Sequence, residues 1–196
     1  MAGGGHYYRG GRGRRMLVSD YLRGVTVEFY TSAGVFSPEG VDEGTRLLVE
    51  SAVVPEEGVV LDLGAGYGVI GITLAKAYPG LRAVLVEVNP RAAELARLNA
   101  RLNRVEDRVR VLVGSLYEPV RGERFDAILS NPPLAAGMET VLGIVRGAPG
   151  HLRPGGSLQM VLRKGAERVR REMMEHFSSV RVLARKKGYT VLYAEA

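Results

Sequence analysis

The chain has 196 residues, a net charge of +6 and no cysteine. A chain of this length can bury roughly 70% of the surface that it exposes when unfolded, so a single α/β domain with a full core is expected. The lack of cysteine excludes disulfides, thiolate metal sites and thiol nucleophiles. Because there is neither a run of about 18 apolar residues nor a signal segment, we expect a cytoplasmic protein with no membrane contact.

The first 24 residues are predicted to be a flexible tail rich in arginine and glycine, followed by one domain over residues 25–196. Residues 1–15 contain no acidic residue and carry four of the six net positive charges. Tails that interleave arginines with aromatics can stack on bases and neutralise phosphates, which favours an RNA partner. A disordered leader with no specific role is the alternative.

A strand is predicted over residues 25–30, and a helix over 43–54 is capped by Asp42. From residue 59 onward, strand-like and helical runs alternate with short loops, which indicates βαβ units and a mostly parallel sheet. The expected strands are 59–63, 83–88, 109–113, 125–130 and 157–162, and the expected helices are 69–78, 90–102 and 138–152. Two last strands, 179–183 and 188–193, are separated by four residues, a connection that permits only an antiparallel pair.

The first of these core strands leads into the loop Asp62-Leu63-Gly64-Ala65-Gly66-Tyr67-Gly68. Its glycines let the backbone approach a ligand at the carboxyl end of the sheet. Residues 66–71 also fit the dinucleotide fingerprint, with Glu87 about 20 residues further on to bind ribose hydroxyls. Asp62 would crowd a pyrophosphate but suits a ligand with an ammonium group, such as S-adenosylmethionine. A partner for the dipole of the following helix is the other interpretation of Asp62.

Asn131-Pro132-Pro133-Leu134 follows the strand predicted at 125–130. Two consecutive prolines cannot donate to a strand ladder or begin a helix there, so the chain must leave the sheet at Asn131. The Asn131 side chain and the carbonyls of Asn131 and Pro132 can then face a cleft and accept hydrogen bonds from a planar amino group. An ordinary strand terminator is the alternative.

The order of these motifs resembles that of class I S-adenosylmethionine-dependent methyltransferases: the glycine loop, then Glu87, then Gly114-Ser115-Leu116, then Asn131-Pro132-Pro133. More narrowly, Gly34-Val35-Phe36-Ser37 with residues 42–48 resembles the small-subunit ribosomal RNA guanine-N2 methyltransferase family and its archaeal single-domain relatives. The resemblance implies an α/β, Rossmann-like, doubly wound fold. Its seven-stranded sheet is mostly parallel with an antiparallel C-terminal strand.

The resemblance also implies S-adenosylmethionine as the cofactor, an RNA substrate and no metal, with ribosomal RNA favoured over transfer RNA. Residues Asp62, Gly64 and Gly66 would hold the methionine portion, Glu87 the ribose, Val88 the adenine face, and Ser115 with Leu116 the adenine edge. The cofactor-binding set is Asp62, Gly64, Ala65, Gly66, Tyr67, Gly68, Glu87, Val88, Asn89, Gly114, Ser115, Leu116 and Asn131. The catalytic set is Asn131, Pro132, Pro133 and Leu134.

Two positions depart from the family pattern. Ser115 stands where an acidic residue is common, and Leu134 stands where related motifs place an aromatic that stacks on the base. Tyr30, Phe36 or another aromatic would then have to supply the stacking. The guanine amine is a poor nucleophile because its lone pair is delocalised into the ring. The Asn131 side-chain oxygen and the Pro132 carbonyl could each accept one N–H and localise that lone pair.

Other functions fit less of the sequence. Cytosine C5 methylation needs a cysteine nucleophile and is excluded. A nicotinamide oxidoreductase explains the glycines but neither Asp62 nor Asn131-Pro132-Pro133. Protein glutamine N5 methylation, which uses a similar motif on an amide, and a non-catalytic cofactor-binding RNA assembly module both stay open. The sequence leaves the target nucleotide and the oligomeric state undetermined.

Overall fold

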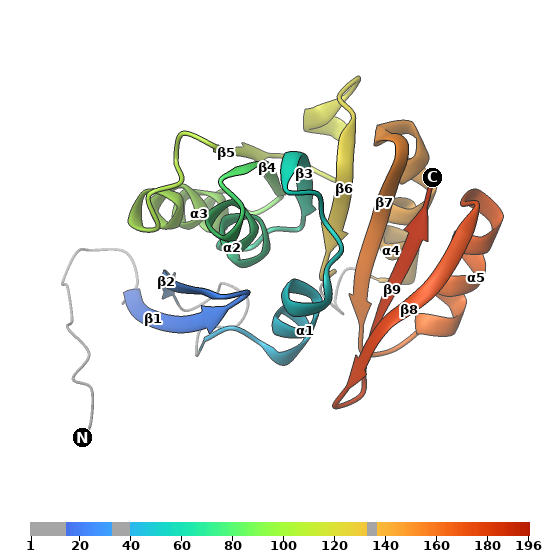
Figure 1. The fold of residues 1–196 in the computed structure, drawn as a ribbon, viewed down its shortest axis with the longest axis horizontal. Coiled ribbons are helices and arrows are strands. Elements are labelled where there is room, and N and C mark those ends of the chain that lie inside the picture. Colours follow the sequence, from blue (N-terminus) through green and yellow to red (C-terminus); the bar gives the residue numbers. More distant parts are fainter. Residues whose placement is uncertain (1–14, 33–39, 133–136) are drawn as a thin grey trace.

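The computed structural model describes residues 15–32, 40–132 and 137–196. Its centre is a seven-stranded sheet with the order β5-β4-β3-β6-β7-β9-β8 (Figure 1). The four neighbouring pairs from β5 to β7 are parallel, whereas β9 is antiparallel to both β7 and β8. The predicted mostly parallel sheet with an antiparallel last strand is confirmed. The strands are β3 (Glu57–Leu63), β4 (Gly80–Glu87), β5 (Val109–Val113), β6 (Phe125–Ser130), β7 (Leu152–Leu162), β8 (Ser179–Lys186) and β9 (Tyr189–Glu195).

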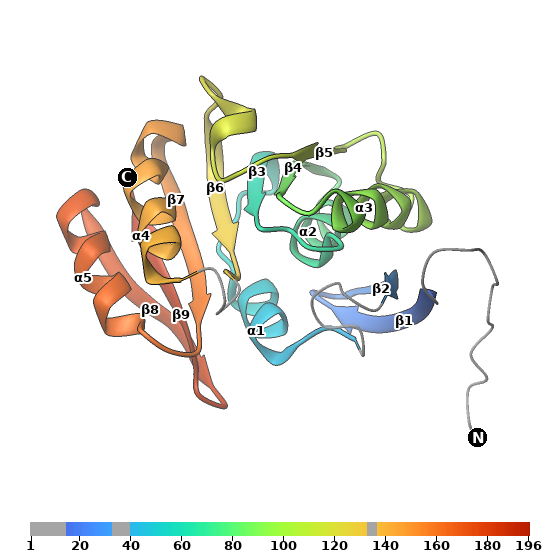
Figure 2. The ribbon, with the colours of Figure 1, turned by 180° about the vertical axis from the view of Figure 1, so that it is seen from behind.

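Helices cover both faces of the sheet. Successive strand residues point to opposite faces, so Val60 packs with one core cluster while Leu61 and Leu63 pack with the other. The first cluster lies under α1, α2 and α3, and the second under α4 and α5 (Figures 1 and 2). The helices are α1 (Glu43–Ser51), α2 (Val69–Ala77), α3 (Pro90–Leu102), α4 (Met138–Gly147) and α5 (Ala166–His176), with the 3-10 turns η1 (Glu118–Val120) and η3 (Ala148–His151).

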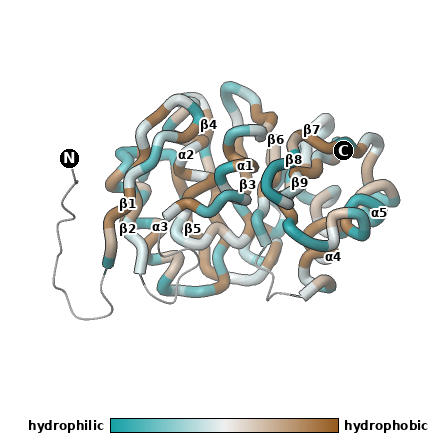
Figure 3. The backbone as a smooth tube through the Cα atoms, turned by 90° about the horizontal axis from the view of Figure 1, so that it is seen from below, coloured by the Kyte–Doolittle hydropathy of each residue, from teal (hydrophilic) through white to brown (hydrophobic). Residues whose placement is uncertain are grey.

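The helix α5 occupies a stretch in which the sequence predicted no element. It buries only Val169 and Met173, and hydrophilic colour dominates it in Figure 3. Two apolar positions four residues apart are a weak helical signal beside so many charges. None of the described helices has the length and apolar character needed to cross a bilayer.

A hairpin replaces part of the predicted tail. Strand β1 (Arg15–Leu22) pairs along its length with β2 (Val25–Ser32), so residues 15–24 belong to the folded part of the chain, and the predicted boundary at 24 is corrected. The turn between the strands is Arg23-Gly24, with φ of 52° and 81°. Two consecutive residues with positive φ, the second of them glycine, form the turn that is favoured in two-residue hairpin loops. The sequence prediction missed this turn because the segment was assigned to the arginine-rich tail. Residues 1–14, with most of the predicted tail, lie outside the described residues.

The connection before β7 also differs from the prediction. The helix expected over residues 138–152 ends at Gly147, and β7 begins at Leu152, five residues before the strand expected at 157–162. Phe125 pairs with Leu152 and Ala127 with Ser157, so β7 bulges between these two pairings. Pro154 lies in the bulge, where its missing N–H removes no ladder hydrogen bond.

Asn99 of α3 and Asn103, which follows the last residue of that helix, hold the hairpin to the domain. Asn99 accepts from the Tyr30 N–H at 2.7 Å, and donates to the Tyr30 carbonyl at 3.1 Å and to the Tyr67 carbonyl at 2.9 Å. One turn later, Asn103 exchanges the same pair of hydrogen bonds with the backbone of Glu28. Each amide thus pairs with β2 as a neighbouring strand would, and Asn99 is fully buried while doing so.

We expect Asn99→Ala to lower the free energy of unfolding by about 1 to 3 kcal/mol, because the substitution leaves backbone groups of Tyr30 and Tyr67 without their partner. Amide exchange should accelerate first in β1 and β2. Thermal denaturation and hydrogen exchange measure both effects. If the variant had the same free energy of unfolding and the same rates of amide exchange in β1 and β2, the hydrogen bonds of Asn99 would not stabilise the hairpin.

Candidate active site

A cavity of about 320 Å³ opens at the carboxyl ends of β3, β4 and β6. After β3 the chain adds β4 and then β5 on one side of β3, and later adds β6 and then β7 on the other side. The direction in which strands are added therefore reverses between β3 and β6, and the cavity lies at this point. Ligands of doubly wound folds bind at this switch point. Ser130 strengthens the junction, because its hydroxyl donates to the Leu63 carbonyl at 2.8 Å.

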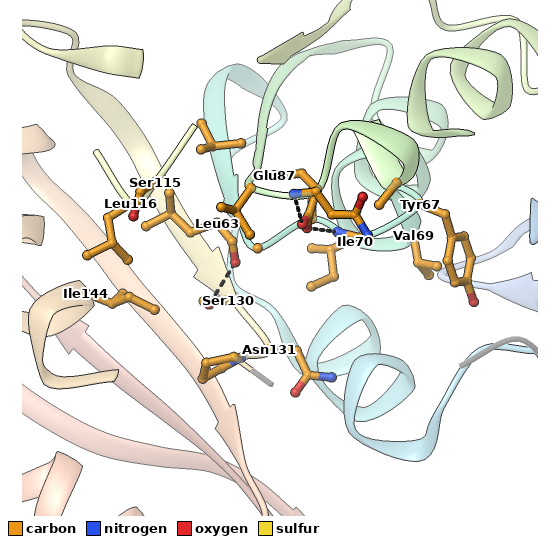
Figure 4. Close-up of a pocket in the computed structure, with 18 of the residues that line it drawn as sticks. Leu63, Tyr67, Val69, Ile70, Glu87, Ser115, Leu116, Ser130, Asn131 and Ile144 are labelled. Atoms are coloured by element: carbon orange, nitrogen blue, oxygen red, sulfur yellow. Dashed lines mark hydrogen bonds between the residues drawn. The ribbon is translucent and has the colours of Figure 1, made fainter. Parts of the chain in front are cut away.

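Most of the residues predicted from the sequence meet around this cavity. Asp62 and Gly68 do not line it, and Pro133 and Leu134 lie outside the described residues. The predicted residues that line it are Gly64, Ala65, Gly66, Tyr67, Glu87, Val88, Asn89, Gly114, Ser115, Leu116, Asn131 and Pro132. Figure 4 shows Ser115, Leu116 and Ile144 on one side, with Val69 and Tyr67 on the other.

The glycine loop needs left-handed backbone. Gly66 has φ of 58°, and Gly68 has φ of 97° and precedes the first residue of α2. At Gly68 a Cβ would also lie 2.6 Å from the Ile72 side chain. The loop is tied to the end of β4 because the Gly64 and Ala65 N–H groups donate to the Val86 carbonyl. Glycine therefore supplies both the turn and the close approach of backbone to the cavity.

Glu87 holds two loops at the cavity. Its Oε2 accepts from the Gly66 N–H and its Oε1 from the Asn89 N–H, both at 2.8 Å (Figure 4). The side chain of Asn89 in turn caps α3 by accepting from the Arg91 N–H. Each Glu87 oxygen keeps a further lone pair, which is what two neighbouring ribose hydroxyls require.

The far end of the cavity is apolar. Val88 is 69% exposed although it directly follows a buried strand, and the surface that it exposes lines the cavity. Leu116 also lines the cavity and has φ of 48°, an uncommon conformation for a branched residue. Backbone strain of this kind concentrates at ligand sites. An apolar side chain and a strained loop thus both border the cavity.

Asn131 is oriented by the first turn of α1. Its side-chain nitrogen donates to Thr45 Oγ1 at 2.8 Å and to Asp42 Oδ1 at 3.3 Å. The same Asp42 oxygen caps α1 by accepting from the Gly44 and Thr45 N–H groups at 3.0 Å. With the NH₂ end engaged, Oδ1 is the end of the amide that can accept from a ligand. Sequence reasoning identified Asp42 as a cap, but missed that Asp42 and Thr45 belong to the site.

Asp62 lies beneath the glycine loop and is fully buried. Its Oδ2 accepts from the Gly71 N–H at 3.0 Å, whereas its Oδ1 has no hydrogen-bond partner among the described residues. Burial raises the pKa of Asp62 to about 7, and the charge of Glu87 adds to this effect. A direct contact between Asp62 and a ligand ammonium stays a prediction.

Potential metal ligands within reach of one another occur away from the cavity. Among the described residues they are Glu172, Glu175 and His176 on the outer surface of α5. Glu172 already accepts from Arg146 Nε at 2.5 Å, which lowers the pKa of that carboxyl. Glu172 thus belongs to a surface ion pair with Arg146, and its Oε1 lies 3.5 Å from His176 Nε2.

Comparison with known proteins gives a consistent result. The family model of the methyltransferase small domain matches residues 26–193. The uncharacterized protein YbxB of Bacillus subtilis (strain 168) is 36% identical, over 97% of this chain and 98% of its own. Ribosomal RNA small subunit methyltransferase C of Escherichia coli (strain K12 / DH10B) is 39% identical over 70% of this chain and 40% of its own.

One solved structure matches nearly the whole chain. It is the 16S rRNA N2 G1207 methyltransferase (RsmC) of T. thermophilus in complex with AdoMet and guanosine. Its TM-score is 0.82 and its identity 27%, over 97% of this chain and 57% of that one. The chain therefore spans only 40% to 57% of the length of these two named methyltransferases.

We expect Asp62→Asn to gain stability relative to the native chain as pH rises from about 4 to 7. A buried carboxyl with a raised pKa stays protonated in the folded state while it ionises in the unfolded state, so it costs stability above the unfolded pKa. Asparagine removes this ionisation, and the difference in free energy of unfolding should shift by up to about 4 kcal/mol. Denaturant unfolding of both proteins at several pH values measures it. A difference that does not change with pH would contradict the raised pKa.

Proposed function

The chain belongs to the methyltransferase small domain family, and we propose that it is an S-adenosylmethionine-dependent enzyme that methylates the N2 amine of guanine in RNA, ribosomal RNA first of all. The observation that carries this proposal is the amide of Asn131, whose NH₂ end is fixed by Thr45 and Asp42. An RNA substrate and this cofactor are also supported by the named relatives, a ribosomal RNA small subunit methyltransferase and a 16S rRNA N2 G1207 methyltransferase in complex with AdoMet and guanosine.

The first cavity fits the cofactor. Its volume lies within the range of small-molecule sites, and its lining pairs a bidentate acceptor, Glu87, with the apolar surface of Val88. Glu87 would hold the ribose and Val88 one face of the adenine. Asp62 is buried, and its Oδ1 has no hydrogen-bond partner among the described residues. An ammonium group bound near the glycine loop would supply that partner. When bound, S-adenosylmethionine supplies an electrophilic methyl group.

Asn131 and Pro132 act on the amine. The N2 nitrogen of guanine carries two N–H bonds in the plane of the ring, and its lone pair is delocalised. Two acceptors, Asn131 Oδ1 and the Pro132 carbonyl, can hold both hydrogens and favour a nitrogen whose lone pair is turned toward the cofactor cavity. Both acceptors come from the two consecutive residues that directly follow β6.

Proton removal needs no dedicated base. The methylated amine is a strong acid and releases its extra proton to water. Among the described residues, the carboxylates that line the cavity are Asp42 and Glu87, and each already accepts backbone N–H groups. Their geometry assigns them to positioning.

The proposed substrate is tested by incubating the protein and methyl-labelled cofactor with unmethylated total RNA and, separately, with total protein. We expect label in RNA, recovered after digestion as N2-methylguanosine. Label in protein as N5-methylglutamine would instead establish the alternative function, because a glutamine amide could use the same two acceptors. Binding of cofactor with no label in either fraction would favour the non-catalytic assembly module.

We expect Asn131→Ala to keep its affinity for the cofactor and to lose turnover by on the order of a hundredfold or more, since one acceptor for the reacting amine is removed. Thr45→Val should give a smaller loss, because Asp42 alone then orients the Asn131 amide. Calorimetry measures binding, and transfer of label measures turnover. Full activity of the alanine variant would contradict the role of Asn131.

A further inference from the structure

A second cavity lies on the other side of the Asn131–Pro132 turn. Its volume is about 500 Å³, and it shares Asp42, Asn131 and Pro132 with the first cavity. Its remaining walls come from α4 and its preceding residue, from the end of β7 and the loop that follows it, and from the start of β9. The acceptors of the proposed reaction therefore stand between two cavities, of which only the first has the features of the cofactor site.

Tyr189 is the one aromatic residue among the described residues that line this second cavity. It is the first residue of β9, and its ring lies against the first turn of α1. A Cβ on Gly44 would lie 2.8 Å from Tyr189 Cε1. Glycine within a helix costs up to about 1 kcal/mol, and here its absent side chain is what admits the ring next to Asp42.

Arg163 lies over the same ring. Its Cζ is 5.7 Å from the centroid of Tyr189, and its side chain is exposed at the end of β7. An aromatic ring and a guanidinium plane are the two kinds of surface on which unstacked RNA bases are held. Both line this cavity together with Asn131.

The surroundings of the cavity are cationic. The chain has four lysines, at positions 76, 164, 186 and 187, and the last three flank this cavity. Lys164 lines it, Lys186 ends β8, and Lys187 lies in the β8–β9 turn before Tyr189. Lys187 Nζ lies 2.6 Å from Glu43 Oε1, so these two charges offset each other, and Arg163, Lys164 and Lys186 leave an excess of positive charge over Asp42. Positive charge around a cavity that contains an aromatic ring suits a nucleotide of an RNA strand, because its base can stack and its phosphates can be neutralised.

We propose that Tyr189 is the stacking surface for the target base, which enters the second cavity with its amine edge toward Asn131. This inference rests on the proposed function. It also identifies the aromatic that would stack on the base in this chain, in which Leu134 occupies the position of the usual aromatic. Tyr30 lines neither cavity and has its backbone bound to Asn99, and Phe36 lies outside the described residues.

The test compares Tyr189→Ala and Tyr189→Phe with Tyr21→Ala, which removes a tyrosine that is 67% exposed on β1. Steady-state transfer of label to ribosomal RNA should show kcat/KM reduced by roughly five- to a hundredfold for Tyr189→Ala. Tyr189→Phe should stay within about twofold of the native chain, because the ring is kept. Cofactor affinity by calorimetry should be equal in all four proteins. Equal kcat/KM for the two alanine variants would overturn the proposal.

A second measurement does not depend on turnover. Guanosine is titrated into the protein with S-adenosylhomocysteine present, and the Tyr189 ring protons are followed by NMR after assignment through their loss in Tyr189→Phe. Stacking should move these protons upfield and saturate. A Tyr189 ring that does not respond at millimolar guanosine would overturn the inference. If the ring shifts but the native chain labels no RNA, the proposed reaction fails while the base site stands.

Discussion

The hydrogen bonds of the Asn131 amide to Thr45 and Asp42 are the constraint on which the rest of the site depends. They join the end of a central strand to the start of a helix 86 residues earlier in the chain. With its nitrogen held in this way, the amide has its oxygen left to accept from a ligand. The arrangement depends on Asp42 capping α1 just before Glu43 and on β6 ending at Ser130, whose hydroxyl donates to the Leu63 carbonyl of the neighbouring strand. The position of the Asn131 amide is thus set by where β6 ends and where α1 begins.

Glu87 provides the same kind of organisation at the proposed cofactor cavity. One carboxylate fixes the glycine loop through Gly66 and the start of α3 through Asn89. Hydrogen bonds to a charged acceptor contribute roughly 1.5 to 3 kcal/mol each, more than neutral ones, so this side chain can hold two loops in one arrangement. The site is consequently formed before any ligand binds, which reduces the entropy lost on binding.

The elements with clear apolar periodicity were predictable from the sequence to the residue, as α3, β5 and β6 show. The hairpin strand β1 was not, because its arginine-rich neighbourhood outweighed a two-residue turn signal. Most cavity-lining residues were predictable because each motif directly follows a strand. Asp62 shows the limit of this reasoning. Side chains alternate along β3, so Leu61 and Leu63 face one core while Asp62 points beneath α2 toward Gly71. The role of Thr45 depends on a contact between distant segments, which no local pattern encodes.

The two cavities explain why α1 begins as it does. In a methyl transfer the attacking nitrogen and the leaving sulfur lie on opposite sides of the carbon, so cofactor and base must approach the acceptor corner from different directions. The first turn of α1 borders both approaches. Asp42 lines the two cavities, Thr45 fixes the amide between them, and Gly44 makes room for the ring of Tyr189. A side chain at position 44 would place its Cβ 2.8 Å from the Tyr189 ring and 3.1 Å from Asp42 Oδ1, so it would disturb both the ring and the carboxylate that borders the two cavities. The two cavities are therefore coupled through the start of α1.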